Sequence, residues 1–439
     1  MRSRLVIWIC GLVWLGLACN LTPAGTPPAA ATSIPTAAAA ALESATATTF
    51  LPTKTRTALP SYERFLCEKK PTVVALLVDP GLANAVRTGL DQFESDLCAD
   101  GYSIVERTLN FTSPPEVRAY LADLYGRTAQ TLEGAIFIGS VPLAHQFFLE
   151  NVGTGDTPPL KEEAISFQYY SDLDGEFSAS PDFHSPGGYA YSFDRHTGEV
   201  DWEIWTAVLP LYRGDEAQTA EALKRYFEKN HLYRTGEYAI PKVFLMISEH
   251  FIAETNSEQA NFLNLLRSGP YSWTPLSDEP TTRIYFQGPA LSVEDGYTDL
   301  SAGAGDITVA EVHGDWTMSG RINTDWVESH PVKTVLFWSD GCSVGNLEHA
   351  ENFLTSVVYS TTSTVLAAKG STNDSGGLGS NGEGYFGHNI AVRLASGKNL
   401  GQSILGHVNV PLIAPWDVNR EFHFSMLVLA GDPTLRLRG

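Results

Sequence analysis

The chain has 439 residues, of which 43% are hydrophobic and 18% are charged, enough to bury a substantial core in one large domain or two smaller ones. Lys and Arg number 29 and Asp and Glu number 50, so the formal net charge is −21 at pH 7. An acidic surface repels the phosphate backbone of nucleic acids. The composition therefore argues against a nucleic-acid partner and otherwise indicates only a soluble body.

The first 19 residues, MRSRLVIWICGLVWLGLAC, have the pattern of an export signal. Arg2 and Arg4 precede an apolar stretch from Leu5 to Ala18, which is too short to span a bilayer comfortably. The small Ala18 before Cys19 resembles the lipobox of bacterial lipoproteins, in which the cysteine becomes the acylated N-terminus. We therefore expect an exported lipoprotein anchored through Cys19 to the outer face of the bacterial membrane. Secretion after cleavage of an ordinary signal peptide is the alternative.

The segment after the signal, residues 20–60, consists mainly of Thr, Ala and Pro with few charges. Such a segment buries too little apolar surface to fold and is typical of a semi-extended tether. Beyond it we expect two α/β subdomains lying side by side. The N-terminal subdomain covers residues 61–238, and the C-terminal, catalytic subdomain covers residues 239–439.

Apolar runs alternate with stretches of helical periodicity along both subdomains. The apolar runs predict buried strands over residues 71–79, 102–109, 134–139, 203–212, 242–248, 306–312, 333–338, 363–369 and 424–430. Helices are expected over residues 82–97, 114–129, 216–231 and 258–266. Continuous apolar strands separated by helices indicate an α/β fold, in which a mostly parallel sheet carries helices on both faces.

The cysteines are informative because an exported protein meets an oxidising environment. Of the five, Cys10 leaves with the signal peptide and Cys19 is the expected lipid anchor. Cys67 and Cys98 flank the first buried strand and helix, so they are candidates for a disulfide. Cys342 remains, and from composition alone it is either an inert core residue or a functional thiol.

The candidate catalytic residues lie at the ends of two predicted strands. The strand predicted over 306–312 ends at His313 and Gly314, and the next strand ends in Ser-Asp-Gly directly before Cys342. The segment between them is long enough for one short helix, and a strand–helix–strand unit normally places its parallel strands close together. His313 and Cys342 then meet at the carboxyl edge of the sheet, where α/β proteins bind their ligands. A thiol beside an imidazole is the minimum requirement for nucleophilic acyl transfer.

Glycines flank both of these residues. Gly314 lets the backbone approach a substrate closely, and Gly341 permits the turn that exposes the sulfur of Cys342. The backbone N–H groups of Gly314 and Cys342 are expected to hold the oxyanion that develops during attack on a carbonyl.

This arrangement resembles the gingipain family of cysteine peptidases, which belongs to the caspase-like clan. The resemblance extends over most of residues 70–439 and rests on the ordered segments GYSIVERTL, GAIFIGSVPLA, YYSDLDGEF, EIWTAVLP, VHGDW, SDGCSVG and LAGDPTLRL. It implies a caspase/gingipain-like fold and an endopeptidase that hydrolyses peptide or protein substrates without a required cofactor. Cys342 would be the nucleophile, and His313 would be the acid–base group.

The same resemblance implies further roles. Glu203 matches a family glutamate that orients the histidine, the alternative being an ordinary carboxylate at a strand start. Asp215 lies in the region where arginine-cutting relatives carry an acidic specificity residue, but it would also serve as a helix cap. Relatives bind calcium, and Asp172, Asp174 and Glu176 alternate as calcium ligands do, with an acidic turn as the alternative.

Other functions remain open. AVLP (207–210) stands where relatives often have Gly-Arg-Ile-Pro, so a catalytically idle, gingipain-like surface binding module is the main alternative. A glycan-active enzyme using Asp172 and Asp174 lacks a partner motif, and the sequence has no GxSxG motif of a serine hydrolase. Four tryptophans lie near predicted strand ends and either line a substrate cleft or pack in the core, namely Trp202, Trp205, Trp316 and Trp338.

Overall fold

The computed structural model describes residues 62–67, 70–108, 111–150, 160–238, 240–241, 243–252, 281–287, 292–303, 305–373, 390, 393–409 and 426–437. The expected signal peptide, the tether, the lipidation site at Cys19 and the helix expected over 258–266 lie outside these residues. Within the described ranges, no helix is both long enough and apolar enough to cross a membrane.

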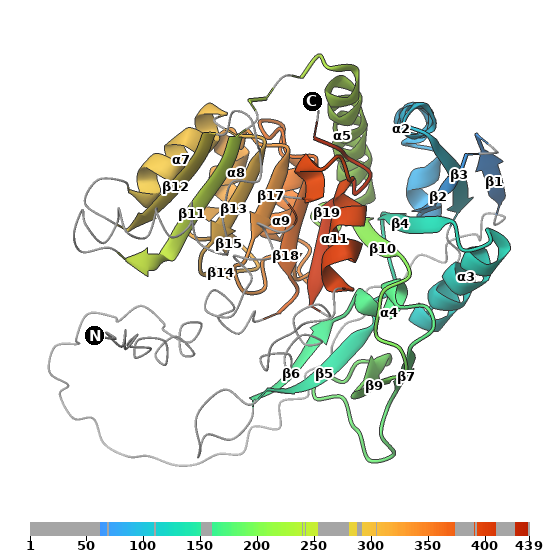
Figure 1. Ribbon diagram of the computed structural model, residues 1–439. Coiled ribbons are helices and arrows are strands. Elements are labelled where there is room, and N and C mark those ends of the chain that lie inside the picture. The colour runs from blue at the N-terminus through green and yellow to red at the C-terminus, as the bar shows by residue number, and fades with distance from the viewer. Residues whose placement is uncertain are drawn as a thin grey trace, which may run out of the picture.

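One continuous sheet of eleven strands organises the molecule, in the order β1-β3-β2-β4-β10-β19-β18-β17-β13-β11-β12 (Figure 1). β1 is antiparallel to β3 and β19 is antiparallel to β18, whereas β2, β3, β4 and β10 pair in parallel, as do β18, β17, β13, β11 and β12. The protein therefore has the α/β fold with a mostly parallel sheet that the sequence predicts. Strands from both expected subdomains belong to this one sheet, and β10 meets β19 at Val208 and Ala430.

The N-terminal half of the sheet is built by consecutive strand–helix–strand units. The chain runs through β2, α2, β3, α3 and β4, and β3 and β4 lie on opposite sides of β2. Because such crossovers are right-handed, α2 and α3 cover opposite faces of the sheet. The elements of this half are β1 (Glu63–Leu66), β2 (Thr72–Val78), α1 (Pro80–Ala83), α2 (Arg87–Ala99), β3 (Tyr102–Thr108), α3 (Pro114–Arg127), β4 (Leu132–Ile138), β10 (Trp205–Leu209) and α5 (Glu216–Thr235).

The C-terminal half repeats this alternation. Strand β12 and helix α7 were not anticipated from the sequence, whereas each predicted strand of this half has a counterpart within a few residues. Helix α5 packs between α2 and α9, which joins the helices of the two halves. The elements are β11 (Val243–Ile252), β12 (Thr281–Gln287), α7 (Val293–Ala302), β13 (Ile307–Glu311), α8 (Thr324–Ser329), β17 (Leu336–Ser339), α9 (Phe353–Tyr359), β18 (Ala367–Ser371), α11 (Leu400–Val408) and β19 (Leu427–Gly431).

Among the described residues, three small sheets lie outside the large one. One of them is attached to the end of β18, because the Thr372 hydroxyl donates to the Ile165 carbonyl over 2.7 Å. The small elements are β5 (His145–Glu150) with β6 (Leu160–Ile165) and β8 (Ser192–Phe193), then β7 (Glu176–Ser178) with β9 (Arg195–Thr197), and β14 (Gly314–Asp315) with β15 (Met318–Ser319) and β16 (Ile322–Asn323). The short helix α4 (Gln168–Ser171) contacts α3 and β10.

In the core of the sheet, a large side chain packs over a glycine. Trp205 on β10 is fully buried, and its indole lies over Gly134 of the neighbouring strand β4. A Cβ at Gly134 would lie 2.0 Å from that ring, so only glycine fits beneath it. Trp202 and Trp338 are also buried, so three of the four tryptophans near strand ends serve the core.

Cys67 and Cys98 form a disulfide between the end of β1 and the last turn of α2, with their Cα atoms 5.8 Å apart. The bond closes a loop that contains β2 and most of α2. A crosslink of this kind stabilises a protein mainly by restricting its unfolded chain.

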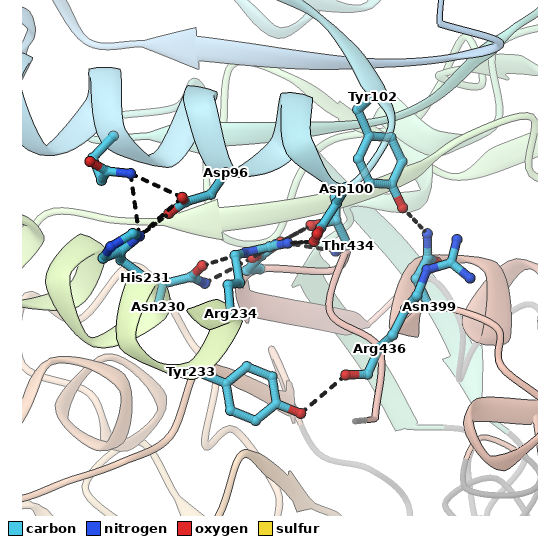
Figure 2. A network of polar contacts seen from close by, with 12 residues as sticks. Asp96, Asp100, Tyr102, Asn230, His231, Tyr233, Arg234, Asn399, Thr434 and Arg436 are labelled. Carbon is cyan, nitrogen blue, oxygen red and sulfur yellow. Dashed lines mark hydrogen bonds and ion pairs between the residues drawn. The ribbon is translucent and has the colours of Figure 1, made fainter. Parts of the chain in front are cut away.

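The N-terminal half and the chain's C-terminal segment are joined by a network of polar contacts, shown in Figure 2. Its centre is Arg234 near the end of α5, which forms ion pairs with Asp432 and with Asp100 at the C-cap of α2. The Asn230 amide donates to Asp432 over 2.8 Å, and the other oxygen of Asp432 accepts from the Thr434 N–H over 2.9 Å. The motif GDPTL thus ends β19 by supplying a buried carboxylate to α5.

Replacing Asp432 by Ala is expected to destabilise the protein strongly. The side chains of Arg234 and Asp432 are 6% and 0% exposed, so the substitution leaves a buried guanidinium without its buried partner. A broken buried ion pair costs about 3–5 kcal/mol of unfolding free energy. The matched control is Asp100→Ala, which removes a partner whose side chain is 43% exposed and is expected to cost at most about 1 kcal/mol. Urea denaturation measures both, and equal losses would contradict this account.

Candidate active site

The two strands that precede His313 and Cys342 are direct neighbours. β13 and β17 pair in parallel, with Ala310 opposite Ser339. The Asp340 N–H donates to the Ala310 carbonyl over 2.9 Å and continues the ladder past the end of β17. The segments after the two strands therefore leave the sheet at the same edge, as the sequence predicts.

Two glycines hold these segments against each other. A Cβ on Gly314 would lie 2.9 Å from the Cα of Gly341 and 2.7 Å from a methyl group of Val344. A Cβ on Gly341 would lie 3.1 Å from the Cα of Gly314. Backbone atoms cannot yield as a flexible side chain would, so position 314 requires glycine, and a Cβ at position 341 would push against Val344 and the backbone of Gly314. The contact brings His313, directly before Gly314, and Cys342, directly after Gly341, to neighbouring places.

The chain turns sharply after Cys342. Ser343 has a φ of 56°, in the left-handed region that few residues other than glycine adopt. The turn is held at the end of β18, where the Ser343 N–H donates to the Asn373 carbonyl and the Gly345 N–H to the Ser371 carbonyl, both over 2.8 Å. Cys342 therefore lies directly before the turn, but it is buried, whereas the sequence predicts an exposed sulfur.

Cys342 and His313 differ in exposure. Cys342 is 7% exposed, whereas His313 is exposed. Cys342 is disulfide-bonded in the structure, so the proposed chemistry requires its reduced thiol.

The segment after His313 is a small antiparallel meander of β14, β15 and β16. The Gly320 N–H donates to the His313 carbonyl over 2.7 Å, and the hydroxyls of Ser319 and Ser339 lie 2.7 Å apart. The meander is thereby fastened both to His313 and to the strand that leads to Cys342.

Glu249, in β11 directly after its last residue paired with β13, is an acidic neighbour of His313 that sequence reasoning missed. Burial raises the pKa of the Glu249 carboxyl, and the charges of Arg321 and His313 oppose that rise. The Tyr297 hydroxyl lies 3.4 Å from Glu249, and the Arg321 guanidinium lies 3.5 Å from it. The sequence does place Glu249 directly after the apolar run of β11. Because β11 pairs in parallel with β13, that position lies beside the end of β13.

Glu203, expected to orient the histidine, belongs to a carboxylate cluster with Asp172 and Asp174. Single ligand oxygens of these three residues lie within 4.8 Å of one another. Burial raises the pKa of the Glu203 carboxyl to about 7, and the charges of Asp174 and Asp172 add to the rise. Glu203 also accepts a hydrogen bond of 2.5 Å from the Leu173 N–H. Its role toward His313 stays a prediction.

The same cluster bears on the expected calcium site. The third carboxylate beside Asp172 and Asp174 is Glu203 and not the expected Glu176. Glu176 is exposed on β7. Asp172 accepts from the Gly175 N–H over 2.6 Å, as in an acidic turn, and lies 2.7 Å from the Nε2 atom of His196. Three carboxylates suit a hard cation such as calcium. Calcium binding stays a prediction.

Asp215, the expected specificity residue, is exposed and caps α5, accepting from the Gln218 N–H over 2.7 Å. This hydrogen bond is the one that a helix-capping role for Asp215 predicts. A role in substrate selection stays a prediction.

A buried ion pair supports the residue before Gly341. The Lys369 ammonium on β18 donates to Asp340 over 3.0 Å and to the Ser339 carbonyl over 3.3 Å, and the side chains of Lys369 and Asp340 are each 3% exposed. The Trp338 indole N–H also donates to Asp340, over 2.9 Å. These bonds fix the end of β17. The sequence signal was a lysine at the end of an apolar strand.

Glu311, the last residue of β13, is a second buried acid at this edge and is only 2% exposed. Burial raises the pKa of its carboxyl to about 8, and the charge of Asp340 adds to the rise. Among the described residues, its Oε2 atom has no hydrogen-bond partner. Glu311 is therefore largely neutral near pH 7.

The variant Glu311→Gln tests this protonation state. The pKa of about 8 in the folded protein lies above the ordinary carboxyl value of about 4.3. The stability linked to the neutral form is thus complete below about pH 4 and is lost as the pH rises toward about 8. Glutamine cannot ionise, so the unfolding free energy of the variant relative to the parent should rise between about pH 5 and about pH 8.5.

Urea denaturation across this range measures the difference, and Glu199→Gln, at an exposed position, is the matched control. A flat difference for Glu311→Gln would show that the carboxyl is already ionised within the folded protein.

Comparison with known proteins supports the fold. No protein-family model matches the chain, and no curated protein matches it in sequence. Among solved structures it is similar to the crystal structure of the Arg-specific cysteine proteinase gingipain R, with a TM-score of 0.56 and 12% sequence identity. The similarity covers 84% of this chain and 79% of that one. At this identity it establishes a gingipain-like, caspase-like α/β fold and nothing finer.

Proposed function

We propose that the protein is a cysteine endopeptidase that hydrolyses peptide bonds with Cys342 as nucleophile and His313 as acid–base group. The observation that carries the proposal is the backbone contact between Gly314 and Gly341 at the ends of two adjacent parallel strands. This contact joins a histidine and a cysteine that lie 29 positions apart. The fold shared with a cysteine proteinase supports the same activity.

The reaction follows from these groups. The Cys342 thiolate attacks the scissile carbonyl carbon, while the backbone N–H groups of Gly314 and Cys342 donate to the developing oxyanion. His313 donates its proton to the departing amine, which leaves a thioester on Cys342. Water, deprotonated by His313, then attacks the thioester and releases the acid product and the thiol.

Support for the dyad comes from the groups around it. The Lys369–Asp340 ion pair fixes the strand end before Cys342, and the meander after His313 is bonded to Ser339. Neighbouring Glu249 offers a negative charge to the protonated form of His313. We assign Glu249 and Glu203 to positioning and electrostatic support, because no reacting atom need touch them.

The cellular setting is also a proposal. Export and an acyl anchor on Cys19 would place the peptidase outside the cell, at the membrane surface, where it meets peptides and proteins. No cofactor enters the reaction, and calcium bound by Asp172, Asp174 and Glu203 would act only as a structural ion. Arginine specificity belongs to the structural neighbour, and the preference of this chain is a readout of the experiment below.

The test uses the full chain under reducing conditions, because Cys342 acts as a thiol. The parent, Cys342→Ala and His313→Ala proteins are incubated with a diverse peptide mixture, with and without calcium, and the products are identified by mass spectrometry. Only the parent is expected to cleave, since losing either member of such a dyad costs several orders of magnitude in rate. A Glu203→Gln variant with altered calcium dependence would assign that residue to the cation cluster.

Two outcomes count against the proposal. Cleavage that persists in the Cys342→Ala protein would exclude this thiol as the nucleophile. The absence of cleavage by all proteins, with Cys342 inert toward iodoacetamide after reduction, would favour a binding module with a gingipain-like fold.

A further inference from the structure

Trp316 is exposed close to the dyad. It is 42% exposed, whereas Trp202, Trp205 and Trp338 are each at most 5% exposed. Trp316 follows Gly314 by two residues, in the turn that joins β14 to β15.

The indole of Trp316 is held in a fixed position. Its ring stacks on the imidazole of His349, with the ring centroids 4.4 Å apart and the planes 10° from parallel. The Trp316 carbonyl accepts from the Phe353 N–H over 2.7 Å. Asp315 accepts from the N–H and the hydroxyl of Thr317, over 2.6 and 2.7 Å, and so fixes the turn itself.

The stack connects the two catalytic segments, because His349 lies seven residues after Cys342 and Trp316 lies three residues after His313. One face of the indole is covered by the imidazole, and much of the rest remains open to solvent. A side chain needed only to fasten two segments together would gain most by complete burial. The exposure that remains is suited to a ligand.

The chemistry of the surface favours an aromatic partner. Aromatic pairs gain about 0.5–1.5 kcal/mol beyond the burial of their area, and a rigid aromatic surface loses little entropy on binding. Two carboxylates adjoin the ring pair along the chain, and both are engaged: Asp315 accepts from Thr317, and Glu348 lies 3.0 Å from the Nε2 atom of His145. That hydrogen bond lowers the pKa of Glu348, as does a second one to Tyr189.

We propose that Trp316, backed by His349, forms a subsite that binds an aromatic side chain of the peptide substrate. This inference rests on the proposed peptidase function and adds a determinant of substrate choice to it. Trp316 is thus a specificity residue that contacts substrate away from the bond that is cut.

The test separates binding from cleavage. Capped hexapeptides in which each position is varied in turn among Phe, Tyr, Trp, Ala and Arg are titrated into the reduced full chain carrying Cys342→Ala, and binding is measured by fluorescence anisotropy. At one position the aromatic residues should bind about five- to tenfold more tightly than Ala. Adding Trp316→Ala should abolish this preference, and adding Trp316→Phe should restore part of it.

Trp326→Ala is the matched control. Trp326 also stacks on a histidine, His330, with centroids 4.7 Å apart and planes 7° from parallel, but it lies on α8 and packs against the core. Its removal takes away a similar ring pair and should leave the aromatic preference intact. Thermal unfolding of each variant confirms that it is folded.

The outcomes separate the subsite from the peptidase. An unchanged aromatic preference in Trp316→Ala, an equal loss of binding for every peptide, or a stronger response to Arg than to aromatic residues overturns the subsite. A preference for aromatic residues that depends on Trp316, in a protein whose parent cleaves nothing, supports the subsite and contradicts the peptidase. Cleavage by the parent, without an aromatic preference that depends on Trp316, supports the peptidase and overturns the subsite.

Discussion

The close approach of Gly314 and Gly341 is the constraint on which the proposed site depends. Neither residue has room for a methyl group, because the atoms that a Cβ would meet include the backbone of the opposite segment. Because β13 and β17 pair in parallel, the segments that follow them leave the sheet at the same edge and at the same level along the strands. The glycines then allow them to touch, so a histidine and a cysteine from separate strands share one small region.

Successive layers of the structure maintain that contact. Asp340, directly before Gly341, forms a buried ion pair with Lys369 of β18. The same strand supplies the Ser371 carbonyl that accepts a hydrogen bond from the turn beyond Cys342. Farther away, Asp432 at the end of β19 engages Arg234 of α5. Strand β19 pairs with β18, so the interaction at Asp432 stabilises the sheet that carries the site. Removing a buried partner at any layer leaves an uncompensated charge, which is costly.

Much of this arrangement could be predicted from the sequence. The continuous apolar strands, the neighbouring positions of β13 and β17, and the need for glycine beside His313 and Cys342 follow from periodicity, topology and chain geometry. The alternative uses of the strand-end tryptophans could not be separated, because burial depends on the elements packed above a side chain. The structure divides them, with Trp316 exposed and the other three buried.

The contacts that the sequence did not predict join residues of different strands or loops. Glu249 is near His313 because β11 lies beside β13, and Lys369 matters because β18 lies beside β17. Glu203 similarly meets Asp172 and Asp174 through the folding of a loop, which no short motif encodes. Pairing of charges across strands is a property of tertiary structure, and sequence spacing carries little information about it.

The central claim is that His313 acts on Cys342, and the rate at which iodoacetamide alkylates Cys342 tests it most directly. A thiolate beside an imidazolium ion persists well below the ordinary thiol pKa of about 8.5. We therefore expect reduced parent protein to be alkylated at about pH 6.5 at least tenfold faster than His313→Ala, with the His330→Ala control matching the parent. Equal rates for the parent and His313→Ala would show that the histidine does not act on the thiol, and the proposed dyad would be wrong.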